Sequence, residues 1–173
     1  MKWVPVVSVC LPYPISANRY FRDRVIPAKR GRAAIVQRYV TKEAREYQAT
    51  VGWLLRKAGV REPLTGRVRV DIQLHPHCPQ DWRTRVRKDP LWWADSVQRL
   101  DLDNCRKVLI DALKGVAIVD DVQVWKDTGE VMEPRIDVPA CVVVRICRGI
   151  KDDPQEALDL PEMPQPQKEV AFP

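Results

Sequence analysis

Carboxylates occur in two closely spaced groups, Asp101 with Asp103 and the pair Asp120-Asp121. Carboxylate oxygens are the ligands that hard divalent cations such as Mg²⁺ and Mn²⁺ take in proteins. The first group opens a predicted helix and the second precedes a predicted strand. A helix that packs back on its own sheet could bring the two groups together. The spacing therefore suggests a metal site formed by Asp101, Asp103, Asp120 and Asp121.

The helix that carries the first group is predicted over 101–114 from its apolar periodicity. Val108, Leu109, Ala112 and Leu113 form one apolar stripe, which indicates an amphipathic helix. Gly115 fits the left-handed position that commonly follows the last helical turn. The predicted helix therefore has a buried face and a polar face.

The same acidic residues also have a simpler interpretation. An aspartate at a helix start is commonly a cap or a partner of the helix dipole. Asp103 and Lys107 are spaced as an ordinary i,i+4 ion pair. The Asp120-Asp121 pair before a strand is typical turn chemistry. Spacing alone leaves the metal site and these structural roles open.

Composition limits the class of protein. The 173 residues suit one domain with a single core. No apolar run approaches the roughly 18 residues of a membrane helix, and prolines interrupt any signal-peptide pattern near the start. The five cysteines are odd in number and lack metal-site spacing, which indicates reduced thiols. We expect a cytoplasmic protein with no membrane partner and no small-molecule organic cofactor.

Charge is distributed unevenly along the chain. The net charge is +6, but residues 151–173 hold two basic and six acidic residues. Removing these from the totals of 29 and 23 leaves 27 basic and 17 acidic residues in 1–150. A basic body with an acidic tail favours a polyanionic partner such as nucleic acid.

Alternation and turn residues predict the remaining elements. The predicted fold is α/β (α+β), with a small mixed sheet of about four strands and two main helices packed on it. The predicted strands cover 4–11, 67–75, 122–126 and 138–147, and a second helix covers 42–58. A turn is expected at 127–129. We predict a domain over 1–149, interrupted by a basic and aromatic insertion loop at 76–98, and a disordered acidic, Pro-rich tail over 150–173.

Two basic segments are candidate DNA surfaces. In the first, the basic residues of 19–38 are interleaved with Tyr20 and Phe21 and followed by Tyr39, a mixture suited to phosphates and exposed bases. In the second, the insertion 76–98 carries alternate arginines from Arg83 to Arg87, which in extended form would share one face. The alternatives are a solvated loop for the first, and a core or dimer anchor at the tryptophans of the second.

The order of these motifs resembles a known family. The segment Arg99-Leu-Asp-Leu-Asp-Asn-Cys-Arg-Lys-Val-Leu-Ile-Asp-Ala-Leu, followed by Asp120-Asp-Val-Gln-Val124, is similar to the signature of the RusA family of Holliday junction resolvases. The opening Leu11-Pro-Tyr-Pro-Ile-Ser-Ala-Asn-Arg-Tyr20 resembles that family's N-terminal motif. The insertion at 76–98 is longer than the family pattern suggests.

The resemblance implies a homodimeric, Mg²⁺-dependent endonuclease that cuts four-way DNA junctions in recombination and repair, often in phages. Matched by position, Asp101, Asp103 and Asp121 correspond to the family's essential carboxylates and Lys107 to its essential lysine. Asp120 is a neighbouring candidate metal ligand, and Mn²⁺ is expected to substitute for Mg²⁺. A non-catalytic DNA-binding protein and a nuclease for other branched DNA are the alternatives. The residues predicted to contact DNA are Asn18, Arg19, Arg22, Arg69, Arg83, Arg85, Arg87, Lys88 and Arg99.

Overall fold

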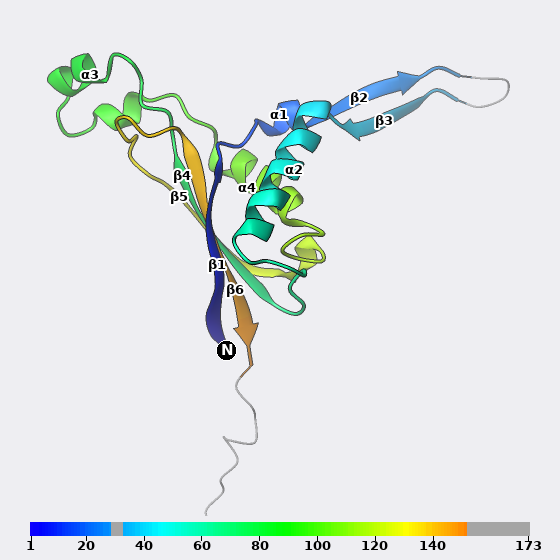
Figure 1. Ribbon diagram of the computed structural model, residues 1–173. Helices are drawn as coiled ribbons and strands as arrows, with labels where there is room; N and C mark the ends of the chain where they lie inside the picture. The colour runs from blue at the N-terminus through cyan, green and yellow to red at the C-terminus, as the bar shows by residue number, and fades with distance from the viewer. Residues whose placement is uncertain (29–32, 152–173) are drawn as a thin grey trace, which may run out of the picture.

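A mixed four-stranded sheet forms the centre of the protein in the computed structural model, which describes residues 1–28 and 33–151 (Figure 1). Its strands, in the order β1-β6-β4-β5, are β1 (Lys2–Pro12), β6 (Cys141–Ile150), β4 (Val68–His75) and β5 (Val124–Val131). β6 is antiparallel to both of its neighbours, whereas β4 and β5 are parallel. Parallel strands need a long crossover connection, which usually contains a helix, and here it contains α4.

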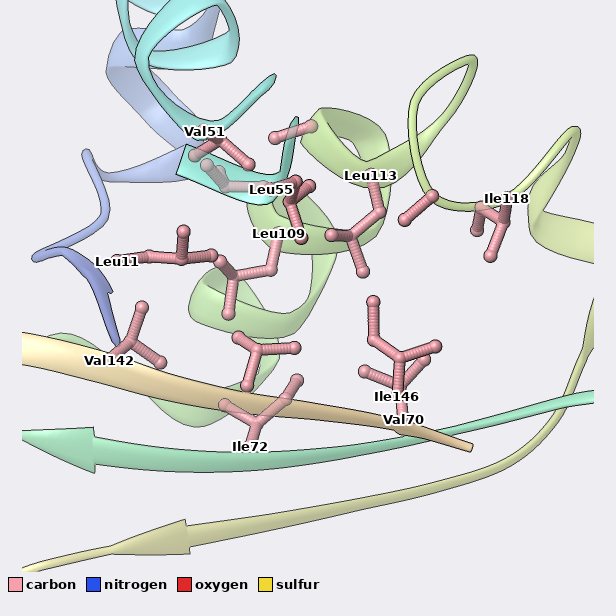
Figure 2. Packing of buried hydrophobic residues seen from close by; sticks show 14 of the residues in the cluster. Leu11, Val51, Leu55, Val70, Ile72, Leu109, Leu113, Ile118, Val142 and Ile146 are labelled. Atoms are coloured by element: carbon pink, nitrogen blue, oxygen red, sulfur yellow. The ribbon is translucent and has the colours of Figure 1, made fainter. Parts of the chain in front are cut away.

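Two helices cover one face of this sheet. They are α2 (Lys42–Lys57) and α4 (Leu102–Leu113). The alternate residues Val68, Val70, Ile72 and Leu74 of β4 are buried beneath them. Figure 2 shows apolar side chains of β4 and β6 facing apolar side chains of α2 and α4 across this interface. The two-residue period of the strands and the stripes of the helices therefore meet in one core.

Local sequence explains where both helices begin and end. The Thr41 side chain accepts a hydrogen bond from the Ala44 backbone N–H at the start of α2. After α4, Gly115 takes a φ of +73°, a conformation that costs other residues energy. The apolar stripe of α4 predicted from the sequence is fully buried.

Shorter elements extend from this body. They are α1 (Ala17–Tyr20), β2 (Phe21–Ile26), β3 (Ile35–Val40), α3 (Trp82–Lys88) and the 3₁₀ helices η1 (Trp93–Ser96) and η2 (Asp121–Gln123). β2 and β3 form a separate antiparallel ribbon. The ribbon and the α3 segment both lie at the end of the molecule away from the N-terminus (Figure 1).

The predicted fold class is confirmed: the fold is a mixed α+β arrangement with four strands in the main sheet. At three places the local structure differs from what the sequence suggested. The expected turn at 127–129 is the middle of β5, because β4 supplies a parallel partner along its length. The described residues of 19–38 form a helical turn and most of a β-ribbon, which differs from the alternative of a solvated loop. Part of the insertion at 76–98 is helical rather than extended.

The last strand begins later than predicted, at Cys141, and runs to Ile150, into the predicted tail. The rest of the tail prediction falls on 152–173, outside the described residues. Within 1–28 and 33–151, no helix is both long enough and apolar enough to cross a membrane.

Candidate active site

The first acidic group lies at the start of α4, as the sequence predicts. Asp101 is the residue before the helix and has extended backbone angles, but its side chain makes no capping hydrogen bond. Asp103 lies in the first turn, with its side chain 83% exposed. Both carboxylates are therefore on the surface, where a phosphate or a cation can approach them.

Arg106 joins this group to the sheet. Its Nη1 donates a hydrogen bond to Asp103 Oδ1 at 2.9 Å, and its Nε lies 2.5 Å from Asp127 Oδ2 on β5. The arginine side chain is 35% exposed, so much of its length is packed. Arg106 thus connects the start of α4 to β5 through two carboxylates.

The second acidic group lies at the opposite end of α4. Asp121 Oδ2 is 3.0 Å from Nζ of Lys114, the residue that ends the helix. Asp120 caps η2, because its side chain accepts a hydrogen bond from the Val122 backbone N–H. At 1.5 Å per residue, the helix axis rises about 16 Å between Asp103 and Lys114.

Within one chain, the structure therefore does not bring the two acidic groups together. Among the described residues, no three His, Cys, Asp or Glu side chains are gathered so that they could hold a metal ion. Asp103 and Asp121 instead face cationic side chains of their own chain. As they stand in a single chain, these residues do not form a ligand set for a divalent cation.

The ion pair at the second group changes the pKa values of both partners. Hydrogen bonds with the Asp120 side chain and with Lys114 lower the pKa of Asp121 below its usual range. The same bond with Asp121 raises the pKa of Lys114. Both groups are therefore charged near neutral pH.

Between the two ends of α4, Lys107 and Asp111 lie on its polar face. Nζ of Lys107 is 5.5 Å from the centre of the Phe21 ring, at the start of β2. Burial raises the pKa of Asp111, an effect that Lys114 opposes and Asp121 reinforces. This face of α4 therefore carries alternating charges from Asp103 to Lys114.

The predicted DNA contacts fall on separate parts of the molecule. Asn18 and Arg19 belong to α1, where Arg19 pairs with Glu43 at 3.0 Å. Arg22 is an exposed residue of the β2–β3 ribbon. Arg69 lies on the sheet face away from α2 and α4, and its Nε donates to Asp71 Oδ1 at 2.8 Å.

The remaining predicted contacts belong to the α3 segment and to the approach to α4. Arg83, Arg87 and Lys88 are exposed on α3. Arg85 is instead held by its own segment, with bonds to Asp81 at 2.9 Å and to the Ser96 carbonyl at 2.7 Å. Arg99 lies at the surface near the start of α4, beside Leu100. The helix therefore separates Arg85 from Arg83 and Arg87, which the extended form would have aligned.

Sequence reasoning missed three side chains that organise the site. Arg106 follows Asp103 by three residues, a spacing that could have identified the pair. Asp127 was hidden by the turn prediction at 127–129. Lys114 received no role from its sequence position, and nothing local to it indicates the bond to Asp121.

A comparison of the chain with protein families gives a match to a family of nucleases. The model of a family described as endodeoxyribonuclease RusA matches residues 12–146, from the end of β1 to β6. The chain belongs to the RusA endodeoxyribonuclease family. A comparison with curated proteins gave no match.

Membership of the RusA family identifies the protein as a nuclease that resolves Holliday junctions, a hydrolase that acts on DNA. Nucleases of this family generally depend on a divalent metal ion. The matched range contains α4, both acidic groups and Lys107.

Proposed function

We propose that this RusA-family protein is an Mg²⁺-dependent endonuclease that resolves four-way DNA junctions by paired, symmetric nicks. The observation that carries the proposal is the family match over 12–146, which includes α4 and both acidic groups. We place the reaction in DNA recombination and repair, in the cytoplasm of a bacterial or phage-infected cell.

We assign the ion to Asp101, Asp103 and Asp121, with Asp120 as a further candidate ligand. Mg²⁺ is the proposed cofactor and Mn²⁺ a substitute, because both prefer carboxylate oxygens. Lys107 is the proposed catalytic lysine. Its ammonium group lies on the polar face of α4, where it can neutralise charge that develops on a phosphate oxygen.

The distance between the two acidic groups supports a site shared by two copies of the chain. A two-fold rotation that sets two α4 helices antiparallel would bring the start of one helix beside the end of the other. Asp101 and Asp103 of one copy would then meet Asp121 of the partner subunit. Because the arrangement is symmetric, a homodimer would have two such sites, one for each strand to be cut.

Mixing two inactive variants tests this proposal. Asp103→Asn and Asp121→Asn should each abolish cleavage of a synthetic four-way junction while leaving junction binding nearly unchanged. In a mixed dimer, one of the two shared sites keeps all of its carboxylates. Mixing the variants in equal amounts should therefore restore nicking to about a quarter of the wild-type rate.

A control variant and two contrary outcomes show whether the site is shared between two subunits and whether its carboxylates are correctly assigned. Glu46→Gln on α2, an exposed carboxylate paired with Lys42, should leave cleavage unchanged. If the mixture stays inactive while wild type cuts, the site is formed within one chain. If Asp103→Asn cuts at the wild-type rate, the assigned carboxylates are wrong.

Substrate choice distinguishes the alternatives. Wild-type protein is incubated with a four-way junction, a flap and a plain duplex, each with Mg²⁺ and with a chelator. Paired cuts in the junction alone support a resolvase. Equal cutting of flaps or duplexes indicates a different branched-DNA nuclease, and binding without metal-dependent cutting indicates a non-catalytic DNA-binding protein.

A further inference from the structure

The β2–β3 ribbon is a projecting arm, defined here as residues 21–26 and 35–40. The strands form six cross-strand pairs, from Phe21 with Val40 at the base to Ile26 with Ile35 at the far end. At about 3.3 Å per residue, the arm is roughly 20 Å long. Figure 1 shows it extending away from the sheet and from α2. Only the two residues at the base of the arm, Phe21 and Val40, are partly buried, whereas its other ten residues are exposed.

The two cross-strand pairs farthest from the base of the arm are apolar, with one pair on each face. Val25 and Val36 are paired and 68% and 66% exposed. The next pair, Ile26 and Ile35, points to the opposite face and is 40% and 58% exposed. Four adjacent branched apolar side chains on a projecting ribbon are unusual for a surface in contact with water alone. Such an end indicates a partner that covers it.

The middle of the arm is cationic. It carries Arg22, Arg24 and Arg38 against a single acidic residue, Asp23. Asp23 pairs with Arg38 at 3.2 Å, whereas Arg24 donates to the amide oxygen of Gln37. This charge favours a polyanion over a second copy of a chain that itself carries a net charge of +6.

The base of the arm is fixed beside the candidate active site. The Phe21 ring lies 5.5 Å from Nζ of Lys107 and 5.7 Å from the guanidinium carbon of Arg38. Tyr20, the residue before it, is 1% exposed and accepts a hydrogen bond from Gln48 of α2. The direction of the arm is therefore set relative to α4 and the proposed catalytic lysine.

We propose that the apolar end of this arm inserts among the bases at the branch point of a DNA junction, while its arginines hold the flanking phosphates. Apolar side chains that enter between base steps partly unstack them, and arginines commonly position such proteins on the backbone. The inference rests on the proposed junction-resolving function and adds a contact that selects the branch point over plain duplex.

The test uses a four-way junction with 2-aminopurine, a base whose fluorescence rises on unstacking, at the branch point. Two variants keep β-branched side chains, and hence strand propensity, while a hydroxyl replaces an apolar group: Val25→Thr/Val36→Thr and Ile26→Thr/Ile35→Thr. The matched control is Val4→Thr/Val6→Thr on the edge strand β1, where both valines are exposed. Circular dichroism verifies that each variant folds.

For wild type and the β1 control, junction binding should raise the 2-aminopurine fluorescence. Each arm variant should lose most of this rise and bind the junction about tenfold more weakly, with little change in its affinity for duplex. Equal fluorescence and affinity in the arm variants and the control would overturn the inference.

Three further outcomes separate a failure of this inference from a failure of the proposed function. If the arm variants change the oligomeric state in analytical ultracentrifugation, the apolar end is a contact between copies of this chain and the inference is wrong. If wild type neither prefers nor cuts the junction, the proposed function itself fails. If wild type cuts the junction and the arm variants behave as the control does, only the inference about the arm fails.

Discussion

Asp111 on α4 lies between two lysines, yet burial raises its pKa above the ordinary value of 3.8. The native state therefore holds a proton on this carboxyl more tightly than the unfolded chain does. Stability from this group is present at low pH and is lost as the pH rises through the folded-state pKa. Near neutral pH, the ionised carboxylate lowers the free energy of unfolding.

Asp111→Asn should consequently raise the free energy of unfolding at pH 7. The gain should shrink as the pH falls toward 3.8, where the native and unfolded chains are both increasingly protonated. Urea unfolding of wild type and variant across this range measures the effect. A variant that is less stable at pH 7 would show that the attraction to Lys107 and Lys114 outweighs burial.

Arg106 is predicted to stabilise the fold because it bridges two carboxylates on different elements. Arg106→Ala should lower the free energy of unfolding by about 1–2 kcal/mol, since Asp127 loses its cation and the packed side chain is removed. Denaturant unfolding measures the loss. Lys42→Ala, which breaks an exposed pair on α2, should cost at most about 0.5 kcal/mol. Equal losses in the two variants would contradict a special role for Arg106.

At the scale of elements, the sequence was sufficient to predict a helix where its apolar periodicity agreed with the residues that start and end it. The stripe of α4 and Gly115 placed Asp101 and Asp103 at a helix start, and the structure has them there. The Asp127-Thr-Gly129 segment carries turn residues, but a parallel partner in β4 determines its conformation. The arm was missed because the alternation of β2 and β3 has no buried face to indicate strands.

The Thr41 side chain links α1 to the start of α2 through two hydrogen bonds. Its Oγ1 accepts from the Ala44 backbone N–H at 3.2 Å and donates to the Arg19 carbonyl at 2.8 Å. Thr41→Ala should lower the free energy of unfolding by about 1–2 kcal/mol, because both bonds are lost at a site only 9% exposed. Thr41→Ser, which keeps the hydroxyl, should retain most of the stability. Thermal unfolding of both variants makes the comparison, and equal losses would exclude the hydroxyl as the cause.

At the scale of the whole molecule, the arm and the α3 segment lie on either side of the covering helices, at the same end of the sheet (Figure 1). The sequence could identify both as basic segments, but not their positions, because each depends on long-range packing. The separation of the two acidic groups was hidden for a similar reason. It follows from the connection after α4, which turns the chain at Gly115 and leaves Asp121 beside Lys114.

The structure predicts which arginines of α3 contribute to DNA affinity. Arg83 and Arg87 are exposed and four residues apart, so they share one face of the helix. If each contacts a phosphate, Arg83→Ala/Arg87→Ala should weaken junction binding. It should also make the plot of the logarithm of the binding constant against the logarithm of the salt concentration less steep, with the magnitude of the negative slope smaller by about two. Binding titrations at several salt concentrations measure this slope.

The control variant removes the same charge elsewhere, with Arg56→Ala/Arg61→Ala around the end of α2, where both arginines are exposed. Its slope should stay close to that of wild type, because overall charge alone produces no discrete phosphate contact. Arg85→Ala should behave differently from both, since Arg85 is bonded to Asp81 and Ser96 and holds α3 against η1. It should destabilise this segment. Equal slopes for the α3 and α2 double variants would assign the α3 arginines to general charge alone.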